Sequence, residues 1–325
     1  MKILYSNEAN FKDEFRALVD RSNIDMQSVM PIVNGIINDI KERGDAALNE
    51  QIAKFDKWEV NGNLAITNGE MKAAYDNLDD KLRNALKLAY ERIKAYHEKQ
   101  VEKSWIDFEP SGAILGQKVT PVDRAGLYIP GGKAAYPSSL IMNAVPAIVA
   151  GVKEIVVCTP AVGGEVNSLL LAAMHLLGIK TAYKVGGASA VAAMAYGTQT
   201  IKKVDVITGP GNIFVATAKK MVYGGVNIDM IAGPSEIGVI ADESANPTHI
   251  AIDLLSQAEH DEIASSFLIT FSAEFANKVN DEIQRLLPNL KRYEIAKASI
   301  DNKAAIIVAC DIDECIELMN ALAVE

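Results

Sequence analysis

A glutamine and a histidine one helical turn apart carry the clearest metal-binding chemistry in this sequence. They are Gln257 and His260, in the run DLLSQAEHD of residues 253–261, where apolar spacing predicts a helix. Residues three apart on a helix share one face, about 4.5 Å apart along the axis. Imidazole suits zinc well, whereas an amide oxygen is an unusual zinc ligand. Alone, the pair is more typical of an exposed helix face, so the surrounding sequence has to decide between the two interpretations.

Four glycine-bearing loops beside strand-like runs form a second candidate site. PGGKAAYPSS (130–139), GGASA (186–190) and TGPGN (208–212) follow expected strands, and AGPSE (232–236) precedes one. Glycine permits positive φ and close backbone approach, so such loops can offer amide donors to polar or anionic groups. Tight turning alone explains one such loop, but four together predict a ligand-binding crevice. No Gly-x-Gly-x-x-Gly follows an expected strand, so the usual dinucleotide fingerprint is missing.

Strands and helices must alternate from about residue 111 onward to position these loops. Strands are expected at residues 126–129, 154–158, 182–185, 204–207, 237–240, 267–270 and 305–308. Helices are expected at residues 139–150, 166–177, 188–196, 213–221, 247–259, 273–287 and 312–322. This alternation predicts an α/β fold with parallel sheets covered by helices on both faces, and the strand count favours two sheets. Residues 1–105 are predicted to be mainly helical, with apolar stripes at spacings of three and four.

Composition argues against a nucleic-acid-binding protein and against a membrane-spanning protein. The 325 residues can bury two cores, and the net charge of −10 argues against a nucleic-acid partner. Cys158, Cys310 and Cys315 form no Cys-x-x-Cys pair, which favours a reducing cytosol and buried thiols. The most apolar segment, residues 140–157, is interrupted by polar residues and proline, so no membrane-spanning helix is expected. We therefore expect a soluble, cytoplasmic protein.

Four long motifs resemble those of the histidinol dehydrogenase family. They are LGQKVTPVDRAGLYIPGGKAAYPSSLIMNAVPA (115–147), VDVITGPGN (204–212), IDMIAGPSE (228–236) and DLLSQAEHD, and the resemblance extends over essentially the whole chain. It implies NAD-dependent, zinc-dependent oxidation of L-histidinol to L-histidine through an aldehyde, the last two steps of histidine biosynthesis. It also implies a homodimer of two incomplete Rossmann-like domains, with active sites that borrow residues from the partner subunit.

The same resemblance implies roles for individual residues. Tyr128 and Asn212 resemble NAD-contacting residues, and Ser235 resembles a substrate contact. Gln257 and His260 resemble two zinc ligands that also border the substrate.

Two departures from the family pattern modify these expectations. Ser189 stands where the family usually carries a glutamine that contacts NAD, so we expect weaker NAD binding or a water-bridged contact. Glu325 resembles the glutamate that activates water, but the catalytic histidine expected next and the other zinc ligands lie beyond the chain's last residue. The polypeptide is therefore interpreted as truncated, with weak zinc retention and no turnover on its own.

Three segments are expected from this interpretation. Residues 1–124 hold a helical N-terminal segment and the start of the first α/β domain, residues 125–236 form the second, NAD-binding domain, and residues 237–325 complete the first, with the C-terminal domains absent. Two alternatives stay open: a relative that oxidises another small alcohol, and a non-catalytic ligand-binding fragment.

Overall fold

The computed structural model describes residues 1–22, 26–62, 64–131, 136–231 and 233–324. The chain forms two compact units: residues 1–24 with 233–325 make unit 1, and residues 25–232 make unit 2. Each unit contains a parallel sheet with helices on both faces, which confirms the α/β fold expected from the sequence. The chain passes from one unit to the other after residues 24 and 232, whereas the sequence led us to expect domain boundaries after residues 124 and 236. The N-terminal helices of residues 26–97 belong to unit 2, because their apolar faces pack on its sheet.

Unit 2 is built on a five-stranded parallel sheet in the order β6-β5-β4-β7-β8. Its strands are β4 (Arg124–Tyr128), β5 (Glu154–Thr159), β6 (Thr181–Lys184), β7 (Val206–Thr208) and β8 (Asn227–Ile228). Successive residues of a strand point to opposite faces. Leu127 and Val157 accordingly enter one core, whereas Tyr128 and Val156 enter the other.

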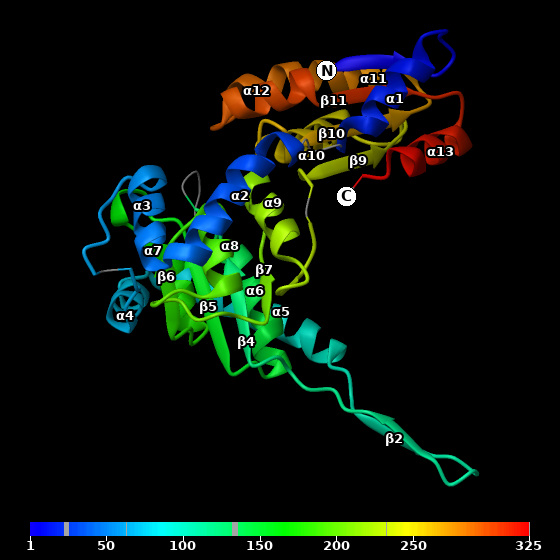
Figure 1. Cartoon of the computed structure of the whole chain (residues 1–325). Coiled ribbons are helices and arrows are strands. Elements are labelled where there is room, and N and C mark those ends of the chain that lie inside the picture. The colour runs from blue at the N-terminus through cyan, green and yellow to red at the C-terminus, as the bar shows by residue number, and fades with distance from the viewer. Residues whose placement is uncertain (23–25, 63, 132–135, 232, 325) are drawn as a thin grey trace. The chain divides into compact units, whose positions relative to one another are not determined.

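Eight helices of the described residues cover this sheet (Figure 1). Buried residues of α2 (Met26–Arg43), α3 (Asp45–Phe55), α8 (Gly187–Tyr196) and α9 (Ile213–Val222) form the core on one face. Those of α4 (Asn68–Asp76), α5 (Asp80–His97), α6 (Pro137–Ala150) and α7 (Ser168–Leu176) form the core on the other. The apolar stripes of the N-terminal helices are thus used for packing.

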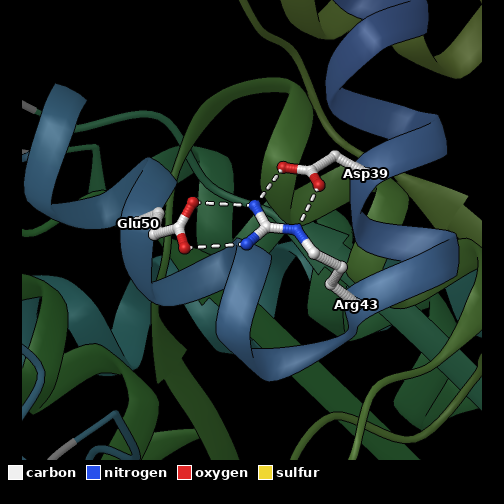
Figure 2. A network of polar contacts seen from close by, with 3 residues as sticks. All are labelled: Asp39, Arg43 and Glu50. Carbon is white, nitrogen blue, oxygen red and sulfur yellow. Dashed lines mark hydrogen bonds and ion pairs between the residues drawn. The ribbon is translucent and has the colours of Figure 1, made fainter.

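A three-residue ion network fixes the corner between α2 and α3 (Figure 2). The Arg43 guanidinium donates to both carboxylate oxygens of Asp39, at 2.6 and 2.8 Å, and to both of Glu50, at 2.7 Å each. Hydrogen bonding to Arg43 lowers the pKa of both carboxyl groups. All three side chains are solvent-accessible, so the network orients the corner without forming part of the core.

Unit 1 is built on a four-stranded parallel sheet in the order β1-β11-β10-β9. Its strands are β1 (Lys2–Tyr5), β9 (Glu236–Ile240), β10 (Ser265–Thr270) and β11 (Ala304–Val308). One face is covered by α10 (Pro247–Ala258), α11 (Ala273–Leu286) and α12 (Tyr293–Asn302), and the other by α1 (Phe11–Val19) and α13 (Ile312–Leu322). Every residue of β10 is buried, as expected for a central strand.

Several elements were not predicted from the sequence. These are β1, β8, α12 and an antiparallel hairpin of β2 (Trp105–Phe108) and β3 (Ile114–Gln117). The expectation that all three thiols are buried was wrong for Cys310, which is exposed, whereas Cys158 and Cys315 are buried. Among the described residues no helix has the length and apolarity needed to cross a membrane.

Candidate functional site

The carboxyl edge of the unit 2 sheet contains a topological switch point. From β4 the chain proceeds outward through β5 and β6, then returns to the other side of β4 to form β7 and β8. The loops after β4 and β7 therefore leave the sheet toward opposite faces, and the space outside a switch point of this kind is where such sheets usually bind ligands. GGASA and TGPGN both begin at this edge, as expected from the sequence. Part of PGGKAAYPSS, residues 132–135, lies outside the described residues.

The peptide of Gly209 in TGPGN is held from both sides at this switch point. Its N–H donates to Asp229 at 2.8 Å, and its carbonyl oxygen accepts from the Lys219 ammonium at 3.0 Å. Lys219 also forms an ion pair with Asp229, and the lysine side chain is only 3% exposed. Gly209 has φ of 122°, and a Cβ there would overlap the carbonyl oxygen of Tyr128. Glycine at this position lets the loop cross the end of β4 closely.

The first amide groups of α8 are occupied by acceptors from within the unit. The Gly187 N–H donates to the Tyr128 hydroxyl at 3.2 Å, and the Gly186 N–H donates to the Asp56 carboxyl group. Burial raises the pKa of Tyr128 to about 12, and burial also raises the pKa of Asp56. In many dinucleotide-binding folds a helix N-terminus receives an anion. Here a carboxyl group of the chain itself, that of Asp56, accepts from the first amide of this turn.

The sequence-predicted NAD contacts all lie at this edge. Tyr128 ends β4, Ser189 lies in the first turn of α8, and Asn212 precedes α9. Ser189 is 5% exposed. The short side chain of Ser189 is therefore buried in the first turn of α8. The Asn212 side chain caps α9 by accepting from the N–H groups of Phe214 and Val215, so its amide NH₂ is the part left for a ligand.

The predicted substrate and zinc residues gather at the amino edge of the unit 1 sheet. Ser235 immediately precedes β9, and its carbonyl oxygen accepts from the N–H of Ser265, the first residue of β10, at 3.1 Å. Gln257 lies in the last turn of α10, and His260 follows that helix. These three residues therefore share one edge of the sheet. In unit 1 the predicted residues thus lie where the strands begin, whereas in unit 2 they lie where the strands end. This agrees with the sequence, in which AGPSE precedes its strand and the other loops follow theirs.

The expectation that His260 lies inside a helix was wrong. Helix α10 ends at Ala258, and the His260 N–H donates to the Gln257 carbonyl oxygen at 3.0 Å in a turn. The turn keeps the two residues adjacent, with His260 exposed and Gln257 half-buried. Gln257 Nε2 is buried and has no hydrogen-bond partner in the part of the chain that the structure describes. Buried amide groups normally have a hydrogen-bond partner, so a bound ligand is a suitable acceptor for this one.

The described residues do not by themselves make a zinc site. Zinc in proteins takes four ligands, or three with water. Gln257 and His260 are two, and no group of three or more His, Cys, Asp or Glu side chains placed to hold a metal occurs within residues 1–324 as far as they are described. Glu325, the predicted catalytic residue, lies outside the described residues.

Sequence reasoning missed a buried ion pair next to Ser235. Arg21, in the short 3-10 helix Asp20–Ser22, donates to both carboxylate oxygens of Glu236, at 2.8 and 2.6 Å. The same guanidinium donates to the Leu322 carbonyl oxygen and lies 4.7 Å from the centre of the Phe267 ring. It thereby ties both ends of the described chain to β9 and β10. A guanidinium that forms two hydrogen bonds to one carboxylate has a defined orientation, so this ion pair fixes the start of β9 beside Ser235.

Asp56, Lys219 and Asp229 were also missed. No local motif marks them, because each acts through a neighbour that is distant in sequence: Asp56 on Gly186, and the Lys219–Asp229 pair on Gly209. A lysine inside the otherwise apolar pattern of α9 was the one available signal.

Comparison with known proteins places the chain among related sequences. The family profile described as histidinol dehydrogenase matches residues 19–325. The histidinol dehydrogenase of Wolinella succinogenes is 61% identical over all of this chain and 76% of its own length, and that of Sulfurimonas denitrificans is 61% identical over 98% and 75%. A crystal structure of histidinol dehydrogenase from Elizabethkingia anophelis is 36% identical and has a TM-score of 0.91, over 100% of this chain and 74% of that one. The chain therefore belongs to the histidinol dehydrogenase family, a family of oxidoreductases of histidine biosynthesis.

Proposed function

We propose that this protein oxidises L-histidinol to L-histidine with NAD as the hydride acceptor. Family membership supports the substrate, and the topological switch point of the unit 2 sheet is the observation that carries the cofactor assignment. Its glycine loops allow a dinucleotide to approach the backbone without the usual fingerprint. When bound, NAD accepts the hydride that leaves the alcohol carbon.

In this proposal Tyr128, Ser189 and Asn212 hold NAD. Tyr128 contributes by position: its hydroxyl already accepts from Gly187, so it anchors the start of α8 at the end of β4. The side-chain oxygen of Asn212 accepts from two backbone N–H groups of α9, which leaves the side-chain NH₂ as a donor for NAD. Ser189 has only a short hydroxyl side chain, which supports weaker NAD binding than a glutamine would give.

Ser235, Gln257 and His260 are proposed to bind the substrate, and Gln257 and His260 to act as zinc ligands as well. The shared edge of the unit 1 sheet and the unpartnered Gln257 amide support this. Two side chains are too few for a zinc site, so we assign no step of the reaction to the metal. Glu325 is proposed as the carboxylate that removes a proton from water when the aldehyde is oxidised. We also propose a cytoplasmic homodimer.

Binding measurements test the proposal without requiring turnover. Titration calorimetry of the 325-residue polypeptide with NAD and with L-histidinol should show saturable binding of each. Ser189→Gln should tighten NAD binding and leave histidinol binding unchanged. Unchanged NAD affinity in that variant would reject the role of Ser189, and absence of affinity for both ligands would reject the enzymatic proposal.

The substrate assignment has its own matched pair of variants. His260→Ala should weaken histidinol binding about tenfold or more, since a ligand-facing imidazole is lost. His249→Ala, at the opposite end of α10, is the control and should bind like the wild type, because His249 is exposed and distant from Gln257 along the helix. Binding of NAD but not of histidinol would point instead to another small alcohol as the substrate.

A further inference from the structure

The second strand of the unit 2 sheet does not end in the acidic residue that dinucleotide-binding sheets use to select NAD. Numbered outward from β4, the strand order β6-β5-β4-β7-β8 is 3-2-1-4-5, the order of those sheets. In them an acidic residue about 20 residues after the glycine loop accepts from the ribose 2′-hydroxyl of NAD. Glu154 has about this spacing, but it begins β5 at the opposite edge and pairs with Arg124. The residue that ends β5 is Thr159, which has no charge.

Asp56 brings a carboxyl group to the end of β5 from another part of the chain. It follows α3, and its carbonyl oxygen accepts from the N–H of Gly163, in the loop after β5, at 2.9 Å. Its carboxyl group accepts from the N–H of Gly186, in the loop after β6. These two loops approach closely, since a Cβ on Gly186 would lie 2.5 Å from Cβ of Pro160, the residue after β5. Asp56 therefore lies between the loops that follow the second and third strands.

The Asp56 carboxyl group can accept further hydrogen bonds and has no counter-charge. A carboxylate offers about four lone-pair sites, and the Gly186 N–H uses one of them. No ion pair among the described residues includes Asp56, and Lys184, the cation that ends β6, pairs instead with Glu70 at 3.3 Å. Asp56 is 8% exposed, so solvent screens its charge only weakly. Such a group accepts well from ribose hydroxyls and repels a phosphate.

We propose that Asp56 selects NAD over NADP, by accepting from the adenosine ribose hydroxyls and repelling a 2′-phosphate. This inference rests on the NAD binding proposed above and names the residue that decides which dinucleotide binds. Two of the proposed NAD contacts adjoin Asp56. Tyr128 accepts from the N–H of Gly187, the residue after Gly186, and Ser189 lies in the same first turn of α8. In this role Asp56 touches the ribose and not the reacting carbon, so it determines specificity and takes no part in hydride transfer.

Glu165 is the first acidic residue after β5 along the chain, and it provides a matched control. It follows the short 3-10 helix Val162–Gly164 and is exposed. Water and salt screen an exposed carboxylate, so its removal should change nucleotide binding little. Comparison of Asp56 with Glu165 therefore separates the acidic group that the fold brings to β5 from the one that follows β5 in sequence.

Titration calorimetry of the 325-residue chain with NAD and with NADP, at pH 8 to favour the ionised carboxylate, provides the test. The wild type should bind NAD more tightly than NADP. Asp56→Asn keeps a side-chain oxygen for the Gly186 N–H but removes the charge, so the ratio of the NADP to the NAD dissociation constant should fall about tenfold or more. Glu165→Gln should keep the wild-type ratio. Titrations with 5′-AMP and 2′,5′-ADP, which differ only in the 2′-phosphate, should show the same shift in Asp56→Asn.

The outcomes separate this inference from the proposed function. An equal loss of affinity for both dinucleotides in Asp56→Asn would give Asp56 a purely structural role and overturn the inference, as would an unchanged ratio or a ratio that falls in Glu165→Gln. Asp56→Ser, which is smaller and also uncharged, should lower the ratio in the same way, and far-ultraviolet circular dichroism should show that both Asp56 variants are folded. A wild type that binds NAD and NADP equally would overturn this inference alone. A wild type that binds neither would overturn the NAD proposal as well.

Discussion

Replacing Lys219 with methionine should loosen the loop that forms one wall of the proposed NAD crevice. Methionine keeps the apolar stem but removes the ammonium group that bonds the Gly209 carbonyl oxygen and pairs with Asp229. The Gly209 oxygen then loses its donor, and the Asp229 carboxylate loses its counter-charge. Both losses act on the peptide that crosses the end of β4.

The magnitude follows from the burial of the two partners. Removing one member of a fully buried ion pair costs about 3–5 kcal/mol. Lys219 is 3% exposed, but Asp229 is 29% exposed, so water partly solvates the carboxylate left behind. We therefore expect Lys219→Met to lower the free energy of unfolding of unit 2 by about 2–3 kcal/mol. Asp229→Asn with Lys219→Met should cost less than the sum of the two single changes, by about 1–2 kcal/mol, because the pair is then removed together.

Urea unfolding followed by tryptophan fluorescence measures this. The two tryptophans, Trp58 and Trp105, both lie in unit 2, and Trp105→Phe leaves Trp58 as the single reporter. With a slope of about 2–3 kcal/mol/M, the midpoint should fall by about 1 M in Lys219→Met. Lys220→Met is the matched control: Lys220 is the next residue on α9 and is exposed, so its change should stay within about 0.5 kcal/mol of the wild type.

Two results would refute the reasoning. A midpoint for Lys219→Met equal to that of the Lys220 control would show that the buried ammonium does not stabilise the loop. Strict additivity in the double variant would show that Lys219 and Asp229 do not act on each other. NAD titration of the same variants should show weaker binding for Lys219→Met than for the control.

Three further predictions concern buried groups. Burial raises the pKa of Asp56, so the folded state favours the neutral carboxyl group, and this stabilisation is lost as pH rises through the raised pKa. The variant Asp56→Asn should therefore be more stable than the wild type at pH 8, and the difference should be smaller at pH 4.5. Urea melts at the two pH values measure this. Gly209→Ala should cost about 3 kcal/mol or more, because the new Cβ meets the Tyr128 carbonyl oxygen at a positive φ, and a midpoint like the wild type's would contradict the close crossing. Arg21→Met leaves the Glu236 carboxylate without its buried guanidinium and should destabilise unit 1 by about 3–5 kcal/mol, seen as an earlier loss of far-ultraviolet circular dichroism.

Much of the fold could be predicted because local patterns carry it. The strand expected at residues 154–158 is β5 (Glu154–Thr159), and the helix expected at residues 213–221 is α9 (Ile213–Val222). Buried parallel strands are continuous apolar runs and amphipathic helices repeat every three to four residues, so both are visible without tertiary information. The hairpin was missed because its strands lack a buried face of their own. The two-residue strand β8 is too short to show a pattern.

The sequence by itself determined the α/β class, the glycine loops at the strand ends and the motifs that resemble the family. Only the tertiary structure decided which groups hold those loops in place. Asp56 reaches Gly186, Lys219 and Asp229 hold Gly209, and these pairs are set by strand order and helix packing rather than by spacing along the chain. The physical reason is that hydrogen bonds and ion pairs of buried groups depend on three-dimensional neighbours, whereas periodicity and turn chemistry are written into adjacent residues.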